Sequence, residues 1–253
     1  SPMAMMSILL KTYYAEKLGK DPKDIYVVAV MPCVAKKFEA ARPEHTLDDG
    51  TPHTDAVLTT RELIWMLKCY GLDLANMPEG VFDSPLGESS GAADIFGTTG
   101  GVLEAALRTA AEVITGQDLA EVEFTEVRAV EGYRERELKI GDLTLSVAVT
   151  NGITNAKTVL DKVVSGEKQF HLIEIMACPG GCIGGGGQPY HHGRMEIVKK
   201  RAEALYREDG DKPIRKSHEN PYIKKLYEEY LGKPLGEKSH HLLHTHYFER
   251  HKI

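Results

Sequence analysis

The sequence lacks a basic excess and any apolar run of membrane-spanning length, and both absences narrow its function. Acidic residues outnumber Lys and Arg by 37 to 31, which gives a formal net charge of −6. Proteins that bind nucleic acid normally carry a basic excess or a basic stripe. Short mixed runs such as residues 199–201 read as solvated helix faces. Because crossing a bilayer takes roughly 20 apolar residues, we expect neither a nucleic-acid nor a membrane partner.

Cysteine is also scarce. Four cysteines in 253 residues are too few for a disulfide scaffold and favour a reducing compartment. We therefore expect a cytoplasmic location and leave a periplasmic one open. Residues 1–6 have neither the charged start nor the long apolar stretch of a secretory signal, and the chain looks as if it begins inside a longer sequence.

Apolar runs alternate with helical patterns along the chain. Residues 25–31 and 170–176 are short, continuous apolar runs, typical of strands buried on both faces. Further strands are expected at residues 55–58, 122–130, 134–140 and 143–150. Helical patterns separate most of them, at residues 5–18, 59–70, 102–114 and 155–164. Strands separated by helices predict an α/β fold with a mostly parallel sheet flanked by helices.

The remainder of the chain, from residue 193, is charged and rich in histidine. Its patterns predict helices at residues 195–206, 220–231 and 239–248, that is, a helical C-terminal tail. The tail histidines have a helical spacing that metal sites also use, but we expect a packing or surface role for them.

Two of the cysteines directly follow predicted strands. Cys33 and Cys178 each follow an apolar strand that ends in methionine and a small residue or proline. In open α/β sheets, ligands bind beyond the carboxyl ends of the strands, so these two thiols can converge on one object. Cys178 and Cys182 form a C-x-x-x-C pair. Cys69 lies inside an amphipathic helix, where we expect an inert core residue.

Residues 178–189 place six glycines around two thiols. Glycine lets the backbone approach a bound group closely, and successive backbone N–H groups can face an anion. An iron–sulfur cluster suits such a loop. Two alternatives remain: a tight loop with incidental thiols, and a zinc site with His191 and His192, although zinc motifs usually pair their cysteines more closely.

Two long motifs resemble signatures of the FeFe-hydrogenases. Residues 31–39, MPCVAKKFE, resemble MPCxxKxxE, and residues 174–189, EIMACPGGCIGGGGQP, resemble ExMxCxxGCxxGGGQP. Stretches at residues 59–63, 87–105 and 215–221 also look like family sequence. The resemblance implies that residues 1–192 are the C-terminal part of the large-subunit catalytic domain and that residues 193–253 are a small-subunit-like tail.

The resemblance also implies a cofactor, the H-cluster. In the family this is a cysteine-bound 4Fe–4S cube bridged to a two-iron site that carries CO, cyanide and an azadithiolate. Cys33, Cys178 and Cys182 match three of the four cysteine ligands, and Cys182 matches the bridging one.

Four further residues match family positions around the two-iron site. Lys36 matches the lysine that donates to an iron-bound cyanide, a charge-assisted bond. Met31 and Met176 match methionines that pack against the site, where soft thioethers fill irregular space. Phe96 is expected in the same wall, and Glu39 is expected as a structural ion-pair partner.

One family signature, TSCCPxW, is absent, and it carries the fourth ligand and a proton-relaying cysteine. The implied function is a part of an oxidoreductase that catalyses reversible oxidation of H2 to protons and electrons. Its implied partners are the N-terminal half that carries the missing cysteine and either ferredoxin or a NAD-linked electron-transfer subunit. We expect the isolated chain not to assemble a complete H-cluster. The alternative is a non-catalytic iron–sulfur homologue, with an assembly or sensory role, that holds only a 4Fe–4S cluster.

Overall fold

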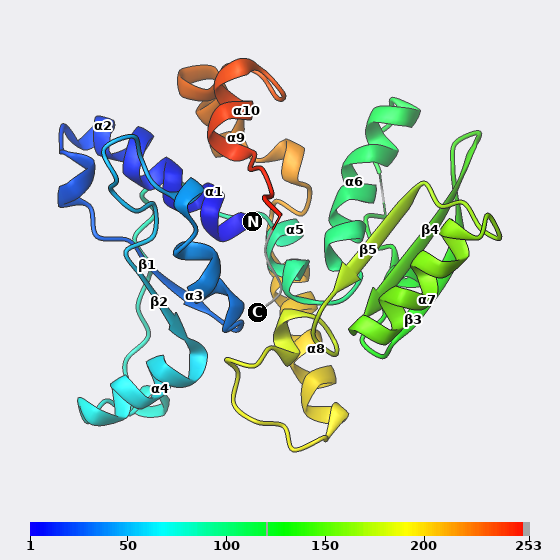
Figure 1. Ribbon diagram of the computed structural model, residues 1–253, viewed down its shortest axis with the longest axis horizontal. Helices are drawn as coiled ribbons and strands as arrows, with labels where there is room; N and C mark the ends of the chain where they lie inside the picture. Colours follow the sequence, from blue (N-terminus) through cyan, green and yellow to red (C-terminus); the bar gives the residue numbers. More distant parts are fainter. Residues whose placement is uncertain (120, 250–253) are drawn as a thin grey trace. The chain divides into compact units, whose positions relative to one another are not determined.

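The computed structural model describes residues 1–119 and 121–249. It divides into two compact units (Figure 1). Unit 1 comprises Ser1–Gly87 together with the segment that begins at Tyr222, and unit 2 comprises Glu88–Pro221. The expected division at residues 192 and 193 is a different one and stays a prediction.

Unit 1 contains a two-stranded parallel sheet and helices from both ends of the chain. Strand β1 (Val28–Met31) pairs with β2 (Ala56–Thr59), with Val28 opposite Ala56. Its helices are α1 (Pro2–Leu9), α2 (Ala15–Leu18), α3 (Ala35–Ala40), α4 (Thr60–Cys69), α9 (Pro221–Leu226) and α10 (Glu237–Leu243). One apolar cluster joins the first helical segment to the C-terminal helices through Ile8, Leu9, Tyr13, Leu226 and Leu231.

Helix α4 shows how local sequence fixes an element of unit 1. The Thr59 hydroxyl accepts from the Glu62 backbone N–H, and the Glu62 carboxylate accepts from the Thr59 backbone N–H at 2.7 Å. This capping box satisfies two otherwise unpaired donors at the helix start. The helix at residues 59–70 is thereby confirmed to within one residue, but Cys69 is exposed on it, so the expectation of a core thiol was wrong.

Unit 2 is built around a three-stranded sheet in the order β3 (Tyr133–Ile140), β4 (Leu143–Asn151), β5 (Leu172–Met176). Strands β3 and β4 are antiparallel, and β4 and β5 are parallel. Figure 1 shows α6 (Gly101–Thr115) and α7 (Ile153–Val164) on opposite faces of this sheet. The α6 face is a closed core in which Leu107 and Val147 are almost fully buried. Helices α5 (Gly91–Asp94) and α8 (Met195–Asp211) complete the unit.

The predicted fold class is confirmed. Two of the three pairings among the described strands are parallel, helices flank the unit 2 sheet, and the tail is helical. Among the described residues, no helix is both long enough and apolar enough to span a bilayer.

Three local expectations were wrong. Residues 122–130 form no strand, because the Ala129 N–H donates to the Thr99 carbonyl and the Asn151 amide holds the Ala129 and Val130 carbonyls. The last described helix ends at Leu243 rather than at residue 248. The strands at residues 25–31 and 170–176 are also not buried on both faces: Val28 is 45% exposed and Ile175 is 46% exposed.

Candidate functional site

The cysteine loop, residues 178–189, follows strand β5 in unit 2. Its first turn is closed by the Gly181 N–H, which donates to the Cys178 carbonyl at 3.0 Å. Cys182 then opens a short 3-10 turn that ends at Gly184. Both cysteines are half-buried. The structure therefore places Cys178 and Cys182 on successive turns of one compact segment.

Two glycines are sterically required in this loop. Gly181 has φ +97°, and a Cβ there would lie 2.8 Å from the Thr99 backbone nitrogen. A Cβ at Gly184 would lie 1.9 Å from the Pro179 carbonyl oxygen. Such contacts are far inside van der Waals distance, so the loop closes on itself and on residues 97–99 only because these side chains are absent.

The backbone amides of the loop are used internally. The N–H groups of Gly184, Gly185 and Gln188 donate to the carbonyls of Gly181, Cys182 and Gly185, at 2.9 to 3.0 Å. With the Gly181 N–H, four of the loop's amides therefore belong to its own turns. The expectation that successive amides of this loop face an anion was wrong for these four.

A buried amide side chain at the end of β4 anchors the loop to the sheet. The Asn151 side chain is 4% exposed and donates to the Thr99 hydroxyl at 3.2 Å, as well as to two carbonyls of residues 129–130. In turn, the Thr99 backbone N–H donates to the Gly180 carbonyl at 3.0 Å. Asn151, the last residue of β4, thus holds Thr99 and residues 129–130 in place, and Thr99 in turn holds the cysteine loop.

Glu174 is a second anchor, which the sequence reasoning missed as a site residue. Its carboxylate accepts from the backbone N–H groups of Gly100 at 2.6 Å and Leu103 at 2.8 Å, at the start of α6. Burial raises the pKa of Glu174, and these amide hydrogen bonds only partly offset the effect. The available signal was a single charged residue inside the otherwise apolar β5.

Phe96 and Met176 flank the loop within unit 2. Phe96 lies in the 3-10 turn Ile95–Gly97, which contacts the turn that begins at Cys182. Its ring packs against the buried cluster of Ala92, Ile95 and Ala105. Met176 is the last residue of β5 and is half-buried.

The cysteine turn, residues 31–39, follows strand β1 in unit 1. Met31 ends the strand and Cys33 is half-buried just beyond it. The Lys36 ammonium forms an ion pair with the Glu39 carboxylate, which also accepts from the Ser1 hydroxyl. Burial acts to raise the pKa of Glu39, but the hydrogen bonds from Lys36 and Ser1 outweigh it and the pKa is lowered. The expectation that Glu39 is an ion-pair partner is confirmed.

The predicted site residues therefore fall into two groups. Cys178, Cys182, Met176 and Phe96 lie together in unit 2, and Cys33, Lys36 and Met31 lie together in unit 1. The meeting of all three thiols at one point stays a prediction.

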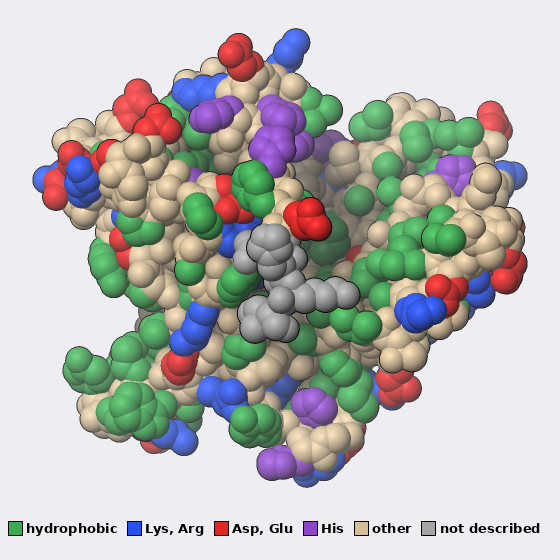
Figure 2. Space-filling model, viewed as in Figure 1, with side chains coloured by type: hydrophobic (Ala, Val, Ile, Leu, Met, Phe, Trp, Pro, Cys, Tyr) green, Lys and Arg blue, Asp and Glu red, His purple; other side chains and the backbone are tan. Residues whose placement is uncertain are grey.

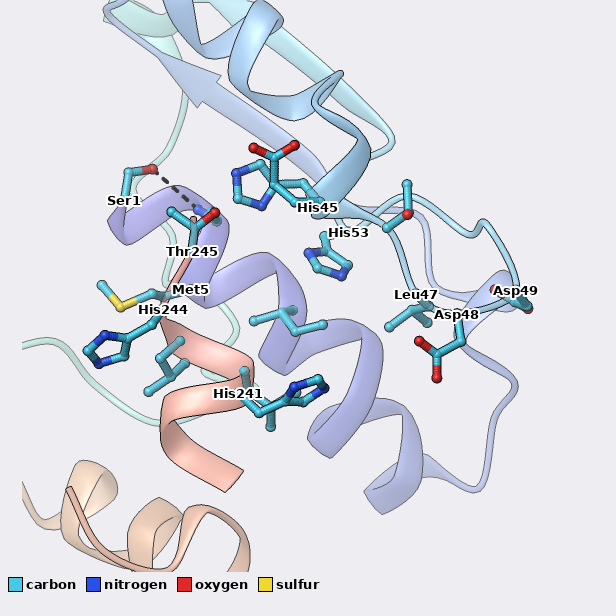
Figure 3. A pocket seen from close by; sticks show the side chains of 16 residues that line it. Ser1, Met5, His45, Leu47, Asp48, Asp49, His53, His241, His244 and Thr245 are labelled. Carbon is cyan, nitrogen blue, oxygen red and sulfur yellow. Dashed lines mark hydrogen bonds between the residues drawn. The ribbon is translucent and has the colours of Figure 1, made fainter. Parts of the chain in front are cut away.

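Unit 1 also holds a cavity of about 470 Å³. Figure 3 shows His45 and His53 on one side of it and His241, from α10, on another. Burial, with a further effect of nearby His45, lowers the pKa of His53 to about 4. The described residues that line the cavity include no cysteine.

A cluster in unit 2 brings ligand atoms of Glu112, His218 and Glu219 within 4.8 Å of one another. Lys216 already forms ion pairs with Glu112 and Glu219. The positive charge that such a cluster needs is thus supplied by the chain itself.

Comparisons with known families match both parts of the chain. The family described as "Iron only hydrogenase large subunit, C-terminal domain" matches residues 1–186. The family described as "Iron hydrogenase small subunit" matches residues 195–250.

Individual relatives are of two kinds. The chain is 55% identical over its whole length to the NADP-reducing hydrogenase subunit HndD of Solidesulfovibrio fructosivorans, of which it covers 43%. It is 32% identical over 262 residues to the cytosolic iron-sulfur assembly component 3 of Rattus norvegicus, and covers 54% of that protein. The chain thus spans about half the length of these curated relatives.

A solved structure is also similar. It is a variant of the apo FeFe-hydrogenase HydA1 from Chlamydomonas reinhardtii, with a TM-score of 0.83 and 43% identity. The match covers 98% of this chain and 68% of that one.

Proposed function

The chain belongs to the family of the iron-only hydrogenase large subunit, C-terminal domain, and we propose that it forms part of an FeFe-hydrogenase that catalyses reversible oxidation of H2 to protons and electrons. The observation that supports this most strongly is the cysteine loop, whose two half-buried thiols are fixed by glycines that admit no side chain. Such a loop is built to present thiolates in a set arrangement.

The proposed cofactor is the H-cluster, held by Cys33, Cys178 and Cys182. The residues present fit this group, because half-buried cysteines in a rigid, glycine-lined loop are the donor type that iron–sulfur clusters use. When bound, the cluster supplies the redox chemistry of H2, and its two-iron site is proposed to carry CO, cyanide and an azadithiolate. The chain supplies position, polarity and exclusion of water.

Lys36 is proposed to donate to a cyanide of that group. Its ammonium has three N–H donors, so the ion pair with Glu39 leaves donors for a ligand while it fixes where the charge lies. The proposed roles of Met31, Met176 and Phe96 are apolar packing at the cofactor. Met31 and Met176 end their strands just before the cysteines.

The proposed partner is the hydrogenase segment that carries the fourth cysteine. Unit 1 supports this, because a two-stranded sheet is marginal on its own and its apolar residues remain exposed: Val30 is 43% exposed and Phe38 is 58% exposed. Figure 2 shows hydrophobic side chains gathered over α4 as well. Ferredoxin or a NAD-linked subunit is proposed as the electron partner.

The alternative role in iron–sulfur assembly is less well supported. The relative with that name is 32% identical, against 55% for the hydrogenase subunit. A cube without the two-iron site would also have no cyanide for Lys36.

The test is anaerobic maturation of the chain together with a hydrogenase segment that carries the fourth cysteine. We expect infrared bands of iron-bound CO and cyanide, and H2 evolution with a chemical reductant. Cys178→Ser and Cys182→Ser should abolish both signals, whereas Cys69→Ser, on exposed α4, should match the unsubstituted chain. A cube seen by electron paramagnetic resonance without infrared bands would favour the assembly role.

A further inference from the structure

Arg201 makes a two-pronged contact with the cysteine loop. It lies in the middle of α8, and one guanidinium nitrogen donates to the Ile183 carbonyl at 2.8 Å. Another nitrogen of the same group donates to the Pro189 carbonyl, also at 2.8 Å. The neighbouring Lys199 and Lys200 are exposed, whereas Arg201 is half-buried. The expectation of a solvated face therefore fails for Arg201 alone.

The two carbonyls bracket the glycine run of the loop. Four consecutive glycines, residues 184–187, lie between Ile183 and Pro189. Glycine loses more conformational freedom on folding than any other residue, so hydrogen bonds from outside the stretch add to the restraint that its internal hydrogen bonds give. A planar guanidinium fork provides it with little entropy loss per hydrogen bond.

Apolar packing also fixes Ile183, one of the two residues whose carbonyls Arg201 binds. Ile183 packs in one buried cluster with Val198 and Ala202, which lie three residues before and one residue after Arg201 on α8. Apolar packing thus holds the helix against the loop, and the two hydrogen bonds from Arg201 orient the carbonyls of the loop. Because Ile183 directly follows Cys182, its Cα lies about 3.8 Å from that of the cysteine.

We propose that Arg201 is a positioning residue that holds the Cys182 thiolate in its ligand orientation by fixing both ends of residues 183–189. The ligand role of Cys182 rests on the proposed function, but the clamp, that is, the pair of hydrogen bonds from Arg201 to Ile183 and Pro189, does not. The two hydrogen bonds from Arg201 also join segments that different families describe, since α8 falls in the small-subunit match and Ile183 falls in the large-subunit match, whereas Pro189 lies in neither.

The first test measures the loop without any metal. Amide hydrogen exchange of residues 183–188 is compared in the unsubstituted, metal-free chain and in Arg201→Ala, Arg201→Lys and Arg207→Ala. Losing two hydrogen bonds to a charged donor should speed exchange about tenfold or more. Lysine, which reaches one carbonyl, should give an intermediate rate, and exposed Arg207 on the same helix is the matched control. Equal protection in Arg201→Ala and the unsubstituted chain would overturn the proposal.

The second test measures the thiolate. The chain is reconstituted anaerobically with iron and sulfide together with the hydrogenase segment that carries the fourth cysteine, and is then reduced. Under these conditions Arg201→Ala should lose iron to a chelator faster and give a broadened paramagnetic resonance signal, with partial rescue by Arg201→Lys. Unchanged signal and iron retention in a variant with a loosened loop would overturn the positioning role. Failure of the unsubstituted chain to bind iron in the presence of that segment would instead contradict the proposed function, while the exchange result would still decide whether Arg201 restrains the loop.

Discussion

In unit 2, the cysteine loop is held from several sides: by the Thr99 amide at Gly180, by close backbone packing at Gly181 and Gly184, and by the Arg201 fork. In unit 1, the cysteine turn is held by side chains instead, through the ion pair of Lys36 with Glu39 and the hydrogen bond from the Ser1 hydroxyl to Glu39, and its backbone beside Cys33 is held more weakly. The Lys36 amide reaches the Cys33 carbonyl at a long 3.4 Å, and Val34 beside the cysteine is 50% exposed.

The part of the proposed site that lies in unit 2 is therefore preformed. The loop of unit 2 takes its shape from contacts inside its own unit, so it should keep that shape without cofactor. The turn of unit 1 carries exposed apolar side chains, which the proposed hydrogenase segment would cover. Three changes, two in unit 2 and one in unit 1, test this comparison.

Gly181→Ala should have the largest effect, and only on unit 2. The new Cβ would meet backbone atoms of residues 97–99 at 2.8 to 2.9 Å, in a backbone conformation with φ +97°. Strain and overpacking together should cost at least about 3 kcal/mol of unfolding free energy. Gly193→Ala is the control, since Gly193 has φ +76° but nothing within 4 Å, and should cost about 1 kcal/mol. Urea denaturation measures both, and equal costs would show that the loop is not tightly packed.

Mild acid should destabilise unit 1 through His53. The imidazole is 8% exposed and its pKa is lowered from 6.5 to about 4, first by burial. Between pH 6.5 and pH 4, His53 is protonated in the unfolded chain but neutral in the folded chain. Its stabilising contribution is therefore complete above pH 6.5 and is lost as the pH falls to 4, by about 3 kcal/mol at most.

The measurement is urea unfolding at a series of pH values, followed by fluorescence of Trp65, the one tryptophan of the chain, which lies in unit 1. His53→Gln should flatten the profile between pH 6.5 and 4. A profile as steep as that of the unsubstituted chain would exclude His53 as its cause. His45, whose pKa is also lowered by burial, would then be the next residue to replace.

The sequence predicted elements that depend on local signals. The capping box at Thr59 and Glu62 lies within four residues, and the structure forms it. The segment at residues 122–130 has the apolar pattern of a strand, but its backbone is held by Thr99 and Asn151, which are distant in sequence. The apolar pattern of residues 122–130 does not reveal contacts with residues so distant in sequence.

The site was predictable only in part for the same reason. Motif spacing placed Cys178 and Cys182 in one glycine-rich loop, as the structure has them. Arg201 gave no signal, because a Lys-Lys-Arg run on a helix looks solvated until the helix is packed against its loop. Burial of β1 on both faces was overestimated because a pattern of apolar residues does not reveal how many strands or helices lie alongside.

The smallest expected effect is that of Glu174→Gln in unit 2. Glutamine keeps one acceptor for the amides at the start of α6 and leaves the other unpaired, which should cost about 1 kcal/mol. The pKa of Glu174 is raised, first by burial. Its own contribution is therefore full below its unfolded value near 4.5 and declines as the pH rises through the folded value. The free-energy penalty of the substitution should accordingly shrink from acid to neutral pH, the opposite of the trend at His53.

Exposed Glu137→Gln on β3 is the control, and urea unfolding of both variants at pH 4 and pH 8 measures the difference. A penalty that grows with pH would mean that the carboxylate is stabilised by the helix amides more than it is destabilised by burial.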